Sequence, residues 1–269
     1  MLKVFQGEQH ADFLIKRGAP AALLIHGFPG TPAEMLPLSP ILNAAGWTTR
    51  GLLLPGFGAE IDSLFQRHPQ EWIDAAVEAL RLLQAAHQPV VLIGYSMGAA
   101  VAIHTAARLK PDRLILLAPF WQLGTRAQRV IFRLTKPVVR HLKPLRRANF
   151  DDPRLRRFLN QFLQDADLDD PEVQQLMRQT TVPVNLFEHI YTLGQGAYQL
   201  AAQIDRPTLI LQGRRDPVVK LEFTRQLLQQ FAGPVDYAEI DAQHDLIDST
   251  LPDWSHLERT LLEFINHAE

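Results

Sequence analysis

The chain has 269 residues, of which 46% are hydrophobic, so it can bury a large core as one domain that carries insertions. Its 27 Lys and Arg residues nearly balance its 29 Asp and Glu residues, and the formal net charge of -2 gives no global field that would attract nucleic acid or an acidic membrane. The chain contains no cysteine, which excludes disulfides, thiolate nucleophiles and cysteine-based zinc or iron–sulfur sites.

Short apolar runs bounded by glycine or proline indicate buried strands in the first half of the chain. They cover residues 21–25, 52–54, 90–93 and 114–117. Helical spacing of apolar residues predicts a helix over 71–86, and a run of helix formers predicts another over 99–109. The alternation returns later, with strands expected at 208–211 and 235–240 and helices at 221–231 and 257–265. This order predicts an α/β fold with a mostly parallel central sheet flanked by helices.

Residues 120–201 contain no comparable strand run and are expected to form helical segments. Proline stops or kinks helices, and the expected breaks lie at Pro137, Pro144, Pro153, Pro171 and Pro183. We therefore predict a core domain made of residues 1–119 and 202–269, with 120–201 as a helical insertion. Residues 126–147 of the insertion are strongly basic, and their spacing is also compatible with an amphipathic docking helix.

The segment Gly94-Tyr95-Ser96-Met97-Gly98 stands between a predicted buried strand and a predicted helix. A serine on such a tight turn is held out above the sheet edge, and the two flanking glycines relieve contacts between the neighbouring elements. The motif alone is common, but its position between strand and helix favours Ser96 as a nucleophile over a simple packing turn.

Serine needs a base within hydrogen-bond reach and a carboxylate that orients this base. Asp216 follows the predicted strand 208–211, and His244 follows the predicted strand 235–240. Both therefore lie at carboxyl ends of strands, where open α/β sheets build their sites, and the order Ser, Asp, His fits a hydrolase sheet. The neighbouring carboxylates Asp241, Asp245 and Asp248 follow no independent strand and are weaker candidates for the acid; His26, which precedes Ser96, is expected to brace a loop.

An acyl-transfer site also needs backbone N–H groups that stabilise the negative charge of the tetrahedral intermediate. Met97 offers one, because it follows the nucleophile at the start of a helix. Phe28 offers the other in the loop after residues 21–25, where Pro29 has no N–H.

Together these segments resemble the α/β-hydrolase superfamily, and within it the bacterial carboxylesterase and monoacylglycerol lipase branch. The resemblance covers nearly the whole chain and rests on residues 26–30, 54–58, 94–98, 213–219 and 243–244. It implies Ser96 as nucleophile, Asp216 as acid and His244 as base, with Phe28 and Met97 as oxyanion donors. It also implies that 120–201 is a cap.

These residues predict a serine hydrolase that cleaves short- to medium-chain carboxylic esters or monoacylglycerols through an acyl-enzyme. Thioesterase, carbon–carbon hydrolase, perhydrolase and acyltransferase activities remain open on the same scaffold, as does a non-catalytic receptor. Ser96 argues against an epoxide hydrolase or dehalogenase, in which aspartate stands at this position. We expect no cofactor and no metal, a small-molecule ester as partner, and no nucleic acid.

The N-terminal residues carry charges and lack the apolar segment of a signal peptide, and no stretch approaches the length of an apolar membrane span. A cytoplasmic location without stable membrane insertion is therefore expected.

Overall fold

The computed structural model describes residues 5, 7–122, 124, 139–153, 155–156, 159 and 167–266. A seven-stranded sheet runs through its centre in the order β1-β3-β2-β4-β5-β8-β9. The strands are β1 (Phe13–Ile15), β2 (Ala21–Ile25), β3 (Thr48–Leu52), β4 (Val90–Tyr95), β5 (Arg113–Leu117), β8 (Thr208–Gly213) and β9 (Val235–Ile240). Within this sheet of the described residues only the β1–β3 pair is antiparallel, which confirms the predicted α/β fold with a mostly parallel sheet.

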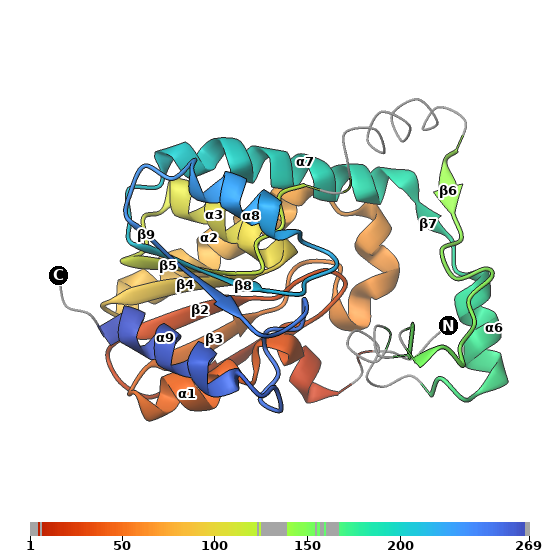
Figure 1. The fold of residues 1–269 in the computed structure, drawn as a ribbon, viewed down its shortest axis with the longest axis horizontal. Coiled ribbons are helices and arrows are strands. Elements are labelled where there is room, and N and C mark those ends of the chain that lie inside the picture. The colour runs from red at the N-terminus through yellow and green to blue at the C-terminus, as the bar shows by residue number, and fades with distance from the viewer. Residues whose placement is uncertain are drawn as a thin grey trace.

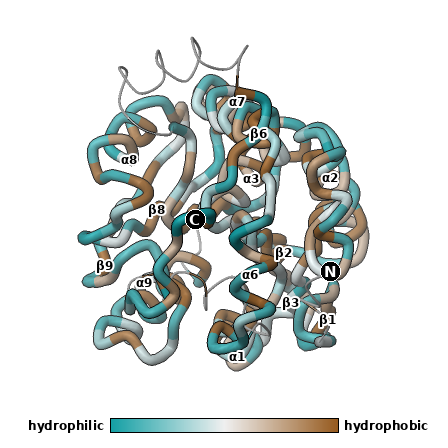
Figure 2. Tube along the Cα trace, turned by 90° about the vertical axis from the view of Figure 1, so that its right-hand side faces the viewer, coloured by the Kyte–Doolittle hydropathy of each residue, from teal (hydrophilic) through white to brown (hydrophobic). Residues whose placement is uncertain are grey.

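Helices cover both faces of the sheet (Figure 1). One face carries α1 (Leu38–Ala44) and α9 (Trp254–Asn266). The other carries α2 (Pro69–Ala86), α3 (Met97–Arg108), α7 (Val184–Leu200) and α8 (Leu221–Leu228). Figure 2 shows the sheet from its side, with β1 at one edge and β9 at the opposite edge.

Alternating side chains of the buried strands pack into two separate cores. In β2, Leu23 and Ile25 join the cluster beneath α2 and α3, whereas Ala22 and Leu24 join the cluster beneath α1 and α9. All five residues of this strand are buried. A strand covered by helices on both faces must be apolar along its whole length, which is why the central strands appear as continuous apolar runs in the sequence.

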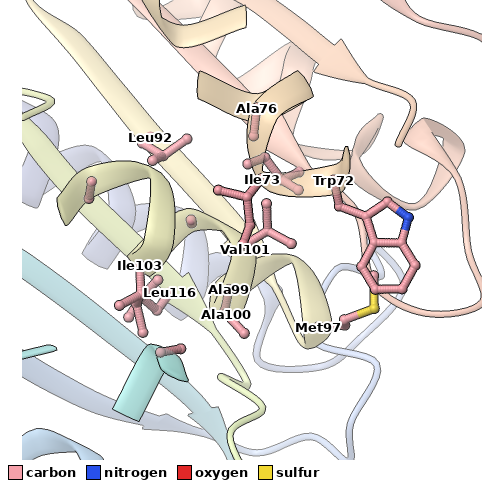
Figure 3. Packing of buried hydrophobic residues seen from close by; sticks show 14 of the residues in the cluster. Trp72, Ile73, Ala76, Leu92, Met97, Ala99, Ala100, Val101, Ile103 and Leu116 are labelled. Carbon is pink, nitrogen blue, oxygen red and sulfur yellow. The ribbon is translucent and has the colours of Figure 1, made fainter. Parts of the chain in front are cut away.

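The first core cluster also positions the nucleophile turn. Trp72 of α2 and Met97 of α3 lie close together in Figure 3, at the end of α3 where Ser96 stands. The Trp72 indole N–H donates a hydrogen bond to the carbonyl of Pro55 (3.0 Å). These contacts fix the start of α3 against the loop that follows β3.

The predicted strand at 52–54 was displaced from its true position. The strand is Thr48–Leu52, and Leu53 and Leu54 lie beyond it. Polar Thr48 and Thr49 are buried because their hydroxyls have partners: that of Thr48 donates to the carbonyl of Gly18, and that of Thr49 accepts from Asn43. Apolar patterning alone therefore misplaced this element; it also did not predict β1 or α1.

Part of the predicted insertion 120–201 lies outside the described residues. Within the described part, β6 (His141–Leu142) and β7 (Val182–Pro183) form a short antiparallel pair that the sequence did not predict. α6 (Pro171–Gln179) begins with a proline in its first turn, and α7 begins directly after Pro183. α7 packs along α3, and its Leu193 and Ala197 belong to the core cluster that contains Trp72.

Shorter 3₁₀ segments complete the described fold: η1 (Glu8–His10), η2 (Pro32–Met35), η3 (Gly58–Gln66) and η4 (Ala201–Gln203). No helix among the described residues combines the length and the apolar character that a membrane crossing requires.

Candidate active site

Ser96 stands in the turn between β4 and α3 with φ 53° and ψ -115°. A non-glycine residue at positive φ outside the left-handed helical minimum is strained, and such strain is held only where the surroundings fix it. Here the Ser96 N–H donates to the carbonyl of Leu117 (2.9 Å), and the Ser96 carbonyl accepts from Phe120 N–H (3.1 Å). The turn is thus tied to the end of β5.

The glycines at both ends of this turn are required by close packing. A Cβ atom at Gly98 would lie 2.3 Å from the carbonyl oxygen of His26 and 2.4 Å from that of Ile25. One at Gly94 would lie 2.5 Å from the carbonyl oxygen of Gly98. Such distances exclude any side chain at these two positions unless α3 moves away from β2 at Gly98 or from β4 at Gly94.

The structure brings Ser96, His244 and Asp216 together from three separate segments. His244 Nε2 lies 2.9 Å from Ser96 Oγ, and His244 Nδ1 lies 2.7 Å from Asp216 Oδ2. Ser96 and His244 are largely buried, with 8% and 9% of their surface exposed. The pair is therefore shielded from bulk water, and the small exposed fraction leaves room for a substrate to approach. If Nδ1 carries the proton and donates to Asp216, Nε2 is free to accept from the serine hydroxyl.

The Asp216 carboxylate is held at both oxygens. Oδ1 accepts the backbone N–H groups of Val218 (2.7 Å) and Val219 (2.9 Å). Oδ2 accepts from the Gln212 side-chain amide (2.8 Å) as well as facing His244. This network leaves the carboxylate little freedom to turn away from the imidazole.

The alternative carboxylates near His244 have other roles among the described contacts. Asp241 forms an ion pair with Arg215 (3.0 Å). Asp248 accepts from both the N–H and the hydroxyl of Thr250. Asp245 lies near enough to Tyr95 for its charge to be among the causes that raise the pKa of that phenol. Asp216 is the carboxylate that contacts His244 Nδ1 (2.7 Å).

His26 braces the loop after β2, as its sequence position predicts. Its Nε2 accepts the N–H of Leu54 (3.1 Å), which requires the proton on Nδ1, and Nδ1 donates to the carbonyl of Gly27 (2.8 Å). Burial lowers the pKa of His26 to about 4. A neutral imidazole with both nitrogens occupied is suited to hold structure.

Phe28 and Met97 both present backbone N–H groups near the nucleophile. Within the described part of the chain, neither amide donates to a protein partner, and Met97 is the first residue of α3. In the same loop, Gly27 N–H donates to Glu34 (3.1 Å), and Pro29 has no N–H. Phe28 therefore carries the unpaired amide of the segment 27–29.

Three supporting residues were not identified from the sequence. Gln212 is fully buried at the end of β8, where its amide contacts Asp216 and the Val219 carbonyl, and its oxygen accepts from Thr224 (2.7 Å). The Tyr95 hydroxyl donates to the carbonyl of His244 (3.0 Å). The third residue is Glu34, whose carboxyl group accepts the backbone N–H of Gly27 (3.1 Å). A polar residue within the apolar run 208–212 is the signal that could have revealed Gln212.

No cluster of three or more histidine, aspartate or glutamate side chains suited to a metal ion occurs within the described ranges.

Proteins of similar sequence match only part of this chain, whereas solved structures of similar fold match almost all of it. The thermostable monoacylglycerol lipase of Bacillus sp. (strain H-257) is 30% identical over 94 residues, which cover 35% of this chain and 38% of the lipase. The carboxylesterase of Bacillus subtilis (strain 168) is 27% identical over 92 residues, which cover 34% of this chain and 37% of the esterase. The matches thus span well under half of either relative.

Solved structures show the same fold over almost the whole chain. A structure from work on the metagenome-derived lipolytic enzymes LipS and LipT has a TM-score of 0.75 at 18% identity and covers 97% of this chain and 99% of its own. The monoacylglycerol lipase of Paleococcus ferrophilus has a TM-score of 0.65 at 18% identity, covering 96% and 99%.

A family model described as serine aminopeptidase S33 (Hydrolase_4) matches residues 19–242, well over half of the chain. The match includes Ser96 and Asp216 and ends just before His244. The chain belongs to this family of α/β-hydrolases.

Proposed function

We propose that this protein is a serine hydrolase that cleaves carboxylic esters through an acyl-enzyme on Ser96. The observation that carries this proposal is the continuous contact from Ser96 Oγ to His244 Nε2 and from His244 Nδ1 to Asp216. The two partial relatives named above are a lipase and an esterase, which supports an ester over an amide as the scissile group.

In the first step, Ser96 Oγ attacks the ester carbonyl carbon while its proton moves to His244 Nε2. The carbonyl oxygen becomes an oxyanion, for which the N–H groups of Phe28 and Met97 are the proposed donors. Collapse of this intermediate breaks the bond to the alcohol oxygen, which takes the proton from His244. The acyl group remains on Ser96.

In the second step, His244 accepts a proton from water, and the resulting nucleophile attacks the acyl carbon. The bond to Ser96 Oγ breaks, the serine regains its proton, and the carboxylic acid leaves. Throughout the cycle Asp216 keeps the imidazole in the required tautomer and stabilises its charged form. Every proton transferred in the cycle passes through His244.

We propose in addition that the insertion 120–201 is a cap over this site. The chain leaves β5 beside the nucleophile, because Phe120 N–H donates to the Ser96 carbonyl (3.1 Å). Six apolar residues of the insertion are available to line an acyl pocket: Phe132, Phe158, Phe162, Leu186, Phe187 and Tyr191. The first three lie outside the described residues. Leu186 packs in the core cluster instead, whereas Phe187 and Tyr191 are half-buried.

A panel of substrates tests the reaction class. It contains p-nitrophenyl and glycerol esters of increasing acyl length, a matched acyl thioester, and an aminoacyl p-nitroanilide for the peptidase activity that the family name denotes. The proposal expects kcat/KM to be highest for one of the esters. A higher kcat/KM for the anilide would identify the protein as a peptidase, and a higher value for the thioester would identify it as a thioesterase; either result would contradict the ester assignment.

A further inference from the structure

Glu34 is a carboxyl group beside the active site that the triad does not use. It lies in η2, and its Oε2 accepts the backbone N–H of Gly27 (3.1 Å), the residue that precedes Phe28. A Cβ atom at Gly27 would lie 3.2 Å from the Cβ of Ser96. Glu34 is thus separated from the nucleophile by one backbone residue.

The loop folds directly onto the Glu34 carboxyl group. A Cβ atom at Gly30 would lie 2.0 Å from the Glu34 carboxyl carbon, so no side chain fits between them. On the far side of the loop, the Thr31 hydroxyl pairs with His10 Nδ1 (2.7 Å). Segment 27–31 is therefore held at both ends by side chains, and Phe28 lies between these anchors.

We propose that Glu34 is a positioning residue that acts in its protonated form, setting the direction of the Phe28 N–H through its hydrogen bond to Gly27, and that loss of its proton disables the oxyanion site. The inference rests on the proposed role of Phe28 in acyl transfer.

Two physical effects support it. A neutral carboxyl group accepts from Gly27 through its carbonyl oxygen at no electrostatic cost to the reaction. An ionised carboxylate at this place would put a full negative charge on the residue next to the proposed oxyanion donor Phe28, and it would repel the developing oxyanion in a partly desolvated setting where charges are weakly screened. Burial raises the pKa of Glu34 to about 8, which agrees with a neutral group at physiological pH.

Two other buried titratable groups near this loop, Tyr95 and His26, do not ionise in the same range. Burial holds the phenol pKa of Tyr95 well above its usual value, and the charge of Glu34 contributes to that shift. His26 stays neutral above pH 4. The elements that pack most closely against η2 carry Glu8 and His10 in η1 and Arg50 in β3. Asp216 and Asp245 lie near enough to Tyr95 to act on its phenol.

The test measures pH profiles from 6 to 10 for the native protein and for Glu34→Gln, Glu34→Met and Glu78→Gln. Two rates are followed: labelling by a fluorophosphonate, which needs the triad but no ester substrate, and kcat and KM for p-nitrophenyl butyrate. Glu78 is an exposed carboxylate on α2 paired with Arg81, and its variant controls for loss of a surface charge.

The native protein should lose about 25-fold in both rates between pH 7.5 and 9.5, with the loss in kcat rather than KM, because a single group with a pKa of about 8 changes state there. Glu34→Gln can still accept from Gly27 but cannot ionise, so its rates should change less than twofold over this range. Glu34→Met lacks the acceptor as well and should be slower at every pH, again without the alkaline loss. Glu78→Gln should follow the native profile.

A native profile that is flat to pH 9.5, or an equal alkaline loss in Glu34→Gln or Glu34→Met, overturns the inference. These outcomes are distinct from a failure of the proposed function. Complete absence of labelling at every pH would refute the triad itself, and labelling without ester hydrolysis would refute only the ester assignment. Circular dichroism at pH 9.5 verifies that a fall in rate occurs in folded protein.

Discussion

Asp216 uses all the hydrogen-bonding capacity of its carboxylate on one task. Two backbone N–H groups and the Gln212 amide fix its position, and the remaining direction points at His244 Nδ1. An acid that is held this firmly orients the imidazole without having to reorganise during the reaction, which is the property that makes preorganised sites effective.

Asp216→Asn should therefore keep the geometry but favour the wrong imidazole tautomer. A loss of about ten-thousandfold in kcat is expected by analogy with a Ser-His-Asp triad. Asp241→Asn is the matched control, since Asp241 pairs with Arg215 rather than with His244. Steady-state kinetics of both variants decide the assignment, which is wrong if the two losses are equal.

Glu34 also links the site to the pH dependence of stability. Its pKa is raised to about 8 in the folded chain, whereas the unfolded chain has the ordinary value of 4.5. Above pH 4.5 the unfolded state therefore releases a proton that the folded state retains, and the free energy of unfolding falls as pH rises to about 8, then levels. The total fall is on the order of a few kcal/mol, because each unit of pKa difference corresponds to about 1.4 kcal/mol.

Urea unfolding at pH 5 and pH 8 measures this effect. The free energy of unfolding of the native protein should fall relative to that of Glu34→Gln between these two pH values. An identical pH dependence in both proteins would mean that Glu34 does not bury a neutral carboxyl group. The unfolding measurement reports loss of the Glu34 proton from the unfolded chain, and this effect ends near pH 8. The activity profile reports loss of the same proton from the folded chain, which is expected to begin near that pH.

At the scale of elements, the nucleophile turn depends on how closely α3 approaches β2. The Gly98→Ala substitution places a methyl group against two backbone carbonyls, which cannot move as a side chain could. We expect a loss of about 1–3 kcal/mol in stability from overpacking and more than a hundredfold in kcat, because the turn that carries Ser96 must shift.

Gly196→Ala on α7 is the matched control. Its added Cβ meets only the end of the His104 side chain, and alanine is the better helix former, so stability should change by less than about 1 kcal/mol. Thermal unfolding and kcat of both variants test this expectation. Native-like activity in Gly98→Ala would show that the turn tolerates displacement.

The accuracy of the sequence prediction also differed between elements. The strands expected at 90–93 and 208–211 are confirmed as β4 and β8, because burial on both faces makes these strands almost entirely apolar. β3 was misplaced because its buried threonines are satisfied by hydrogen bonds that no apolar pattern reveals. The three proposed triad residues were predicted from their positions after strands. The roles of Gln212 and Glu34 were not predicted, because short side-chain contacts such as those of Gln212 with Asp216 and of Glu34 with Gly27 follow no periodic pattern in the sequence.

At the scale of the whole molecule, the insertion 120–201 starts at the sheet edge that carries Ser96, and α7 is its last helix. Because α7 packs along α3, a deletion must retain it. Replacing residues 124–182 with a short Gly/Ser linker should flatten the dependence of kcat/KM on acyl length if the segment is a cap. Each acyl methylene buried under it would be worth about 0.8 kcal/mol. Unchanged selectivity in a folded, active variant would exclude the cap.

The covalent intermediate on Ser96 is the claim on which the whole account depends. Intact-protein mass spectrometry after fluorophosphonate treatment measures it directly, with the peptide that contains Ser96 located by digestion. The native protein should gain one phosphonyl group on Ser96, and a folded Ser96→Ala variant should gain none and lose about a million-fold in turnover, as in serine hydrolases whose triad acts as a unit. Labelling or turnover that persists in Ser96→Ala would contradict the account.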